Sequence, residues 1–185
     1  MNELKFVPVT KGKECQNIDE KDAPKQEKLI TIQISKYLTN TIAEKIAEAQ
    51  WHSCAPEWIN RIRMATYDDN YFYDCFDVVA LGKSDTVIGR LHCIQNENNR
   101  NLWYYGDLFV IPEYRRMGIA AQMIHAAINH LRDLGAKTLR VYVEPDNLPS
   151  IALQKSIGFE EKPYQDFNQL ILDGELMFEL DLPCP

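Results

Sequence analysis

The chain has 185 residues, of which 45% are hydrophobic and 25% are charged, and its formal net charge is −7. This length and composition predict a single domain with one substantial core. No apolar run reaches the 18 or so residues of a membrane-spanning helix, and the acidic balance argues against a general nucleic-acid binder.

The amino terminus and the cysteines predict a cytoplasmic protein. Residues 1–5 lack the basic and then apolar segments of a signal peptide. The five cysteines are odd in number and scattered, without Cys-x-x-Cys spacing. This pattern favours reduced thiols over a disulfide framework or a zinc site, so we expect no bound metal.

The first third of the chain predicts a loose extension followed by a strand and two helices. Residues 1–27 are polar and lysine-rich, which is typical of a loose segment with at most one short edge strand; residues 28–185 form the predicted domain. Leu29–Ser35 alternates in polarity like a half-buried strand. Thr41–Glu44 has the pattern of a capping box that opens a helix reaching about Gln50, and Pro56 suits the first turn of a second helix to about residue 66.

The middle of the chain predicts three strands joined by hairpins. Cys75–Leu81 and Thr86–Gln95 are apolar, β-prone runs on either side of a turn at residues 82–85. Asn96–Arg100 reads as a second hairpin loop, and the aromatic run Leu102–Val110 is the third strand.

The turn after Val110 has the composition of a phosphate site. Pro112 ends the strand because proline has no N–H to donate to a sheet. Apolar residues recur at helical spacing from Ile119, so a helix begins directly after Arg115, Arg116 and Gly118. The first N–H groups of a helix are unpaired and lie at the positive end of its dipole, where they bind anionic phosphates. Glycine permits a close approach of the backbone, and arginine adds charge and forked donors.

The last part of the chain predicts a parallel strand, a helix and a final hairpin. The helix that begins at Ile119 ends at Gly135, and Leu139–Val143 is the next strand, parallel to the strand Leu102–Val110 because a helix intervenes. Asp146–Pro149 opens a further helix that ends at Gly158. Leu170–Leu172 and Leu176–Leu182 are predicted to form an antiparallel hairpin through Asp173 and Gly174.

Two segments resemble the GNAT N-acetyltransferase superfamily. Arg115-x-x-Gly118-x-Ala120 is similar to the family's (Gln/Arg)-x-x-Gly-x-(Gly/Ala) motif, and Asn147 to Phe159 resembles its Asn-x-x-Ala-x-x-x-Tyr-x-x-x-Gly-Phe segment. The resemblance covers about residues 76–180. It implies an α/β (α+β) fold in which a mixed, mostly antiparallel sheet is flanked by helices in the order β-α-α-β-β-β-α-β-α-β-β. It also implies that the parallel strands ending at Val110 and Val143 part to admit acetyl-CoA.

The resemblance implies a set of cofactor-binding residues. The loop would hold the pyrophosphate, strand backbone would orient the thioester, and the second segment would lie near the pantetheine arm. Asn147 is equally well explained as a helix cap. The implied residues are Leu108, Phe109, Val110, Arg115, Arg116, Met117, Gly118, Ile119, Ala120, Asn147 and Ser150.

The chain departs from the family pattern at Gln154, where a tyrosine is thought to protonate the departing CoA thiolate. An amide supplies no proton in this way, so the general acid is not carried over. Gln154 either donates a hydrogen bond to the sulfur or lies at the helix surface.

A base or a water relay is useful because the acceptor amine must lose a proton. Asp107 on the central strand and Glu144 after the next strand are the candidates, and a surface or capping carboxylate is the alternative for each. Strand alternation puts Tyr105, Asp107 and Phe109 on one face, unless a bulge at Gly106 re-aims Asp107. The four histidines show no metal-binding pair and are read as structural or solvated.

The resemblance thus implies transfer of an acetyl group from acetyl-CoA to a primary amine by direct attack on the thioester. The acceptor is a small-molecule or peptide amine, and a homodimer is compatible with this reading. The alternative is a non-catalytic module that binds or senses acyl-CoA.

Overall fold

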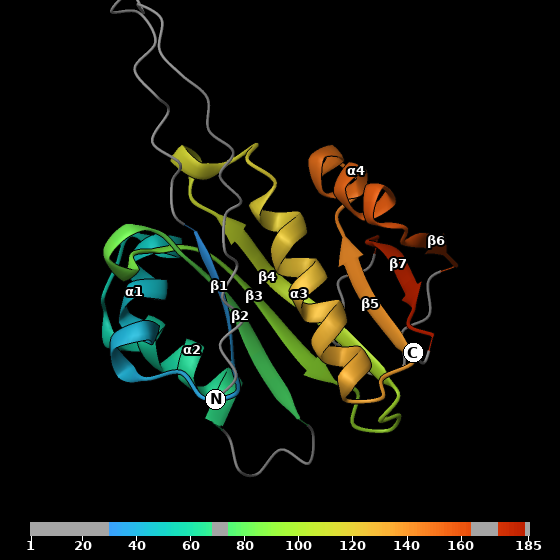
Figure 1. The fold of residues 1–185 in the computed structure, drawn as a ribbon, viewed down its shortest axis with the longest axis horizontal. Helices are drawn as coiled ribbons and strands as arrows, with labels where there is room; N and C mark the ends of the chain where they lie inside the picture. The colour runs from blue at the N-terminus through green and yellow to red at the C-terminus, as the bar shows by residue number, and fades with distance from the viewer. Residues whose placement is uncertain (1–29, 68–73, 164–173, 184–185) are drawn as a thin grey trace, which may run out of the picture.

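The computed structural model describes residues 30–67, 74–163 and 174–183. Within these ranges the chain forms a seven-stranded sheet in the order β1-β2-β3-β4-β5-β7-β6 (Figure 1). The elements in chain order are β1 (Thr31–Ser35), α1 (Asn40–Trp51), α2 (Pro56–Tyr67), β2 (Cys75–Leu81), the 3₁₀ turn η1 (Lys83–Asp85), β3 (Val87–Gln95), β4 (Leu102–Val110), the 3₁₀ turn η2 (Pro112–Tyr114), α3 (Ile119–Asp133), β5 (Thr138–Val143), α4 (Leu148–Ile157), β6 (Glu160–Lys162) and β7 (Leu176–Asp181).

The predicted order of strands and helices is confirmed from β1 to α4 and for β7, whereas the short strand β6 (Glu160–Lys162) was not predicted. β4 and β5 are parallel, and the other neighbouring strands in this sheet are antiparallel. Gly135 and Gly158 both adopt positive φ after the helices that they were predicted to end. The extension 1–27 and the hairpin arm Leu170–Leu172 lie outside the described residues, so the predicted domain boundary and that hairpin stay predictions.

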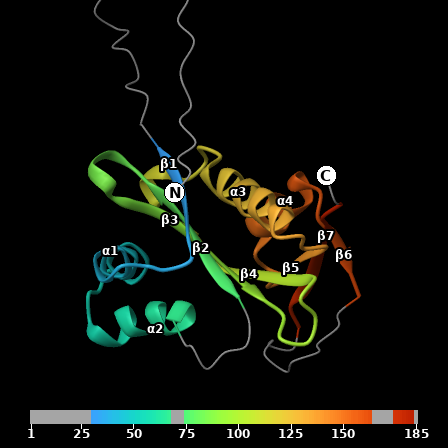
Figure 2. The same ribbon diagram turned by 60° about the horizontal axis from the view of Figure 1, so that its bottom comes forward.

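Helices cover both faces of the sheet (Figure 2). One core lies between the sheet and α3, with Met123, Ile124 and Ala127 fully buried on the helix at the spacing that one helical face requires. A second core joins α1 and α2 to the opposite face through Ile46, Ile62 and their neighbours. Each side chain of β4 therefore lies on one of two faces of the sheet, and each face has its own core.

The predicted capping box at Thr41 is wrong in its position, because Thr39 caps α1. Thr39 has extended backbone angles, and its Oγ1 accepts a hydrogen bond of 3.3 Å from the N–H of Ile42. Two threonines lie near the helix start, and only the one with an extended backbone can turn its hydroxyl back onto the first turn.

The parallel strands β4 and β5 part toward their carboxyl ends. Their register consists of Leu102 with Thr138, Trp103 with Leu139 and Tyr104 with Arg140. Beyond Tyr104, β4 continues to Val110 without β5 as a partner, while β5 remains paired with β7 up to Val143. Figure 1 shows the two arrowheads diverging with the start of α3 beside the opening. The expected separation of these strands is confirmed.

Candidate active site

The loop between β4 and α3 holds its backbone in an unusual shape. The Nε–H of Arg115 donates to the carbonyl of Val110 at 2.9 Å, which ties the loop to the end of the strand. Arg116 and Gly118 both have positive φ, at 62° and 75°. Left-handed residues within a turn direct neighbouring N–H groups to one side, and such concave backbones bind anions.

The first turn of α3 presents free N–H groups at this loop. The N-cap residue is Gly118, which has no side chain to accept a hydrogen bond, and the first turn carries no acidic residue. The Gln122 N–H is bonded to the Gly118 carbonyl at 3.0 Å, so the three N–H groups before it have no intrahelical partner. By contrast, Thr39 caps α1 and Asn147 caps α4. The amino terminus of α3 is thus an uncapped helix end with positive polarity, and it lies beside the parted strands.

A β-bulge in β4 corrects the predicted facing of Asp107. Arg90 pairs with Phe109 and His92 with Gly106, so both Asp107 and Leu108 oppose the single residue between Arg90 and His92. Asp107 is left-handed, with φ of 50°, a conformation that aspartate tolerates better than most residues.

The bulge separates residues that simple alternation would place together. Tyr105 packs into the core under α3 and α4, whereas Phe109 packs against the α1/α2 core. Asp107 bonds to Arg90, whose other partner is Asp77. The prediction that Tyr105 and Asp107 share a face is therefore wrong, and the bulge lies one residue after the expected Gly106.

The sequence reasoning missed an ionic network beneath Asp107. Arg90 is 1% exposed, and its Nε–H donates to Oδ1 of the fully buried Asp77 at 2.7 Å. Its Nη1 donates to Oδ2 of Asp107 at 3.1 Å, and the Asp107 side chain is 51% exposed. The available signal was the presence of Asp77 and Arg90 inside otherwise apolar strands, since buried charges are rare unless they are paired.

Gln154 is not a surface residue, which removes one of the two predicted readings. It is fully buried, and its amide oxygen accepts a hydrogen bond from the hydroxyl of Tyr105. Its amide nitrogen donates to Oγ of Ser150 at 3.4 Å. Burial raises the pKa of Tyr105, so this hydroxyl stays protonated at neutral pH. The hydrogen bond between Gln154 and Tyr105 therefore links α4 to β4.

Three further predicted residues, Glu144, Asn147 and Ser150, follow the carboxyl end of β5. Oδ1 of Asn147 accepts from the N–H of Ser150 at 3.2 Å, as the helix-cap reading requires. Glu144 is exposed and lies near Glu175, whose pKa is raised by burial and by the charge of Glu144. Glu144 and Asp107 thus occupy different surroundings.

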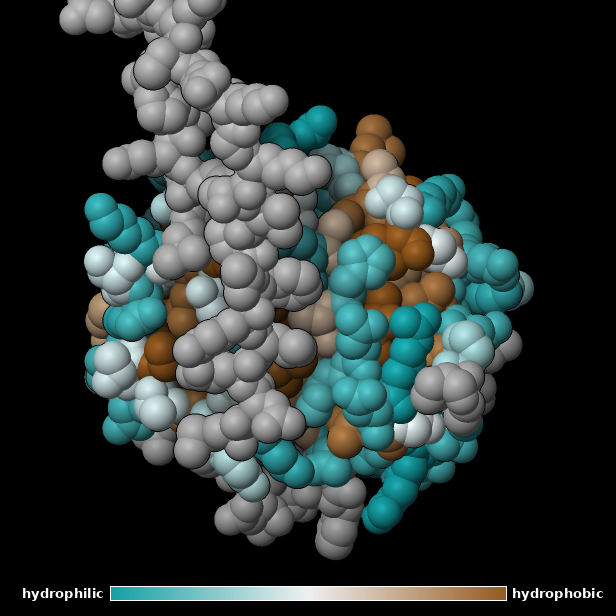
Figure 3. All heavy atoms as spheres, in the orientation of Figure 1, coloured by the Kyte–Doolittle hydropathy of each residue, from teal (hydrophilic) through white to brown (hydrophobic). Residues whose placement is uncertain are grey.

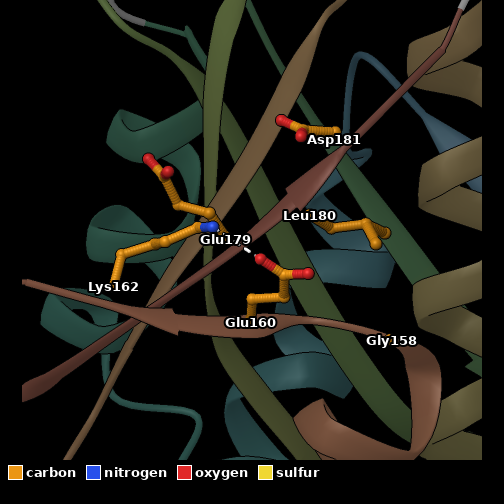
Figure 4. A pocket seen from close by; sticks show the side chains of 6 residues that line it. All are labelled: Gly158, Glu160, Lys162, Glu179, Leu180 and Asp181. Atoms are coloured by element: carbon orange, nitrogen blue, oxygen red, sulfur yellow. Dashed lines mark hydrogen bonds and ion pairs between the residues drawn. The ribbon is translucent and has the colours of Figure 1, made fainter.

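The surface near the parted strands differs from the hollow at the edge of the sheet. Figure 3 shows apolar residues between α3 and α4, in front of β5. The edge hollow of about 140 Å³ is lined by β6 and β7, and it contains the ion pair of Lys162 with Glu160 at 2.5 Å (Figure 4). It lies on the far side of β5 from β4, so it is separate from the α3 loop.

Within the described ranges, no helix has the length and apolar character needed to span a membrane.

Known proteins resemble this chain in sequence. The model of the acetyltransferase (GNAT) family matches residues 44–159. Mycothiol acetyltransferase of Corynebacterium glutamicum (strain R) is 26% identical over 136 residues, 66% of this chain and 44% of that protein. An uncharacterized N-acetyltransferase of Methanocaldococcus jannaschii is 32% identical over 69 residues, 37% of this chain and 30% of that protein. The match thus spans less than half the length of either relative.

Solved structures share the fold. The ribosomal-protein-S18-alanine N-acetyltransferase from Escherichia coli has a TM-score of 0.59 at 19% identity, covering 85% of this chain and 96% of that one. The PaiA N-acetyltransferase from Thermoplasma acidophilum, solved in complex with coenzyme A, has a TM-score of 0.58 at 18% identity, covering 82% and 99%. The family match covers more than half of the chain and agrees with the parted strands and the open helix terminus, so the chain belongs to the acetyltransferase (GNAT) family.

Proposed function

We propose that this protein transfers an acetyl group from acetyl-CoA to a primary amine by direct attack of the amine on the thioester. The observation that carries the proposal is the parting of β4 and β5 beside the uncapped start of α3. An extended ligand with an anionic diphosphate suits this arrangement, since the helix terminus offers N–H donors to the charge.

The loop fits the diphosphate through both its backbone and its charge. A Cβ at Gly118 would meet only Gln122 Nε2, at 4.0 Å, among the residues that the structure describes, so a phosphate can approach the backbone closely. Arg116 is exposed and supplies a cation. The proposed diphosphate-binding residues are Arg115, Arg116, Met117, Gly118, Ile119 and Ala120.

The thioester and its arm are proposed to lie along β4. From Tyr105 onward this strand has no β5 partner in the described register, which leaves backbone groups on that edge for a ligand. The backbone of Leu108, Phe109 and Val110 is proposed to orient the thioester and polarise its carbonyl. Asn147 and Ser150 are proposed to border the pantetheine arm. Holding the amine and the thioester in contact supplies much of the rate.

The acceptor is proposed to approach from the α1/α2 face, because the α3 side takes the diphosphate. Asp107 lies on that face with half of its carboxylate exposed, so it is placed to attract a protonated amine. Glu144, exposed at the end of β5, is the second candidate carboxylate. The net charge of −7 is compatible with a cationic small-molecule or peptide acceptor.

We further propose a cytoplasmic location and allow for a homodimer. The location is supported by Cys54, Cys75 and Cys93, which form no disulfide bond among the described residues. The names of the Corynebacterium glutamicum relative and of the Escherichia coli structure refer to mycothiol and to an alanine of ribosomal protein S18, so the relatives alone select no acceptor class.

The decisive experiment measures thiol release from acetyl-CoA across a panel of amines, including polyamines, aminoglycosides, amino acids and peptide amino termini. Release that depends on one amine, with an acetylated product of the matching mass, supports the proposal. Acetyl-CoA binding by calorimetry without release for any amine would favour the acyl-CoA-binding module instead. The folded Arg116→Glu variant serves as the control for specific use of the loop.

A further inference from the structure

A buried ionic network on the α1/α2 face has polar atoms that its own members do not satisfy. Asp77 and Arg90 are almost completely buried, and their ion pair is extended to Asp107. Oδ2 of Asp77, Nη2 of Arg90 and Nε2 of His92 are buried and have no hydrogen-bond partner among the described residues. Leaving such atoms unpaired costs free energy, so three of them in one network indicate a place where water or a ligand is bound.

The carboxylate of Asp77 determines the tautomer of His92. Nδ1 of His92 lies 3.2 Å from Oδ1 of Asp77. An ionised carboxylate only accepts hydrogen bonds, so Nδ1 must carry the proton. In the neutral ring, Nε2 is then a bare acceptor. This is the tautomer needed for a group that receives a proton.

Open space lies beside His92 on the same face. The residue paired with His92 across the strands is Gly106, which is exposed and has no side chain to cover its neighbour. A Cβ at this position would meet no heavy atom of the described residues within 4 Å. The half-exposed carboxylate of Asp107 follows directly in the chain. An amine held by Asp107 over Gly106 would thus lie near the imidazole.

The other groups near His92 do not compete with it as proton acceptors. Asp77 on β2, Arg90 on β3 and Asp107 on β4 are the charged groups that the described ion pairs join to His92 or to one another. Burial and Asp77 raise the pKa of the Cys75 thiol on β2 to about 11, so it is uncharged at neutral pH. The helices that cover this face contribute buried apolar side chains, namely Ala43, Ile46, Ala47 and Ile62.

We propose that His92 is the proton acceptor for the acceptor amine, with Asp77 as the residue that fixes its tautomer and Asp107 as the group that holds the ammonium. The inference rests on the proposed acetyl transfer. The ammonium gives one proton to a bound water, which passes a proton to the buried Nε2 of His92, and the freed amine attacks the thioester carbon. The new C–N bond forms as the C–S bond breaks, and the departing thiolate is protonated by the second proton of the nitrogen. Arg90 joins the two carboxylates and holds both in place.

The test compares the pH dependence of kcat/KM for the wild type and His92→Gln with the best acceptor of the panel. General-base transfer contributes about 10²–10⁴ in rate, so His92→Gln is expected to lower kcat/KM at neutral pH by about 100-fold. The loss should shrink at high pH, where the amine is already deprotonated in solution. A residue with only a structural role would give no such recovery. His125→Gln is the matched control, because His125 is exposed on α3, and it should leave the profile unchanged.

Two further measurements keep the inference open to refutation if His92→Gln folds poorly. Long-range ¹H–¹⁵N spectra of the wild type should show the neutral ring of His92 protonated at Nδ1, and the Nε2–H tautomer would overturn the proposal. Gly106→Val should raise the KM for the amine at least tenfold while acetyl-CoA affinity stays the same, because valine suits a strand but fills the open space; an unchanged KM would also count against it. A folded His92→Gln enzyme with the wild-type pH profile refutes this inference alone, whereas a wild type that acetylates no amine refutes the proposed function as well.

Discussion

Replacement of Gly118 by valine separates the role of the loop in binding from its role in folding. Gly118 has φ of +75°, and Gly135, at the other end of α3, has φ of +77°. Neither site is crowded, since the Cβ of Gly118 would meet only Gln122 Nε2 at 4.0 Å and that of Gly135 would meet nothing within 4 Å among the described residues. A side chain in the left-handed conformation costs about 1–2 kcal/mol, so both valine variants should lose about this much unfolding free energy.

Only the Gly118 variant should lose affinity for acetyl-CoA. Its Cβ and methyl groups would lie where the diphosphate must approach the backbone, and relaxation of the turn would move the free N–H groups of α3. We expect at least a 100-fold rise in Kd, or about 2.7 kcal/mol, and no change for Gly135→Val. Denaturant unfolding measures the first quantity and calorimetry with acetyl-CoA the second. Equal affinities in two folded variants would refute the placement of the diphosphate at α3.

The other predictions concern charge and the buried amide. Arg116→Glu should weaken acetyl-CoA binding by calorimetry, and wild-type binding should fall with rising salt; a folded variant with unchanged affinity would remove Arg116 from the site. Gln154→Ala should cost about 2–3 kcal/mol in denaturant unfolding, because it leaves a cavity and the hydroxyl of Tyr105 without its acceptor, while kcat changes by less than about tenfold; a thousandfold loss of kcat with binding intact would show that the amide takes part in the chemistry. Asp107→Asn should raise the KM for the amine and Glu144→Gln should not, and the reverse pattern in steady-state kinetics would transfer the acceptor contact to Glu144.

The regular elements were predictable because their signals are local. Glycines in the left-handed conformation mark the start of α3 and the ends of α3 and α4, and glycine is the residue that accepts this conformation most easily. Alternating and helical periodicity gave the strands and the faces of the helices, since burial of one face imposes the period. The cap of α1 was misplaced by two residues because two threonines compete and only their backbone angles distinguish them.

The α1/α2 face, where we propose that the acceptor binds, was much less predictable because it depends on contacts between strands. Asp77, Arg90 and Asp107 come from three different strands and meet only through the register of the sheet. Gln154 occupies the position where the resemblance implies a tyrosine, but its partner Tyr105 lies 49 residues away in sequence. The sequence motif is confined to the loop between β4 and α3, where we propose that the cofactor binds, and it carries no information about this network.

The bulge in β4 is stabilised from both faces of the sheet. Without the extra residue, Tyr105 and Asp107 would lie on the same face, and one of them would have to abandon its partner. Loss of the Tyr105 bond would leave the buried amide oxygen of Gln154 unsatisfied. Loss of Asp107 would leave the buried Arg90 with Asp77 as its carboxylate partner.

The left-handed backbone of Asp107 costs about 1–2 kcal/mol, whereas removing one partner from a buried ion pair costs about 3–5 kcal/mol. Because the Asp107 side chain is half exposed, its ion pair with Arg90 stabilises the bulge by less than about 3–5 kcal/mol. The hydrogen bond of Tyr105 on the opposite face further favours the bulged strand over the regular one. The same irregularity therefore directs Tyr105 into the α4 core and turns Asp107 toward the face where we place the acceptor.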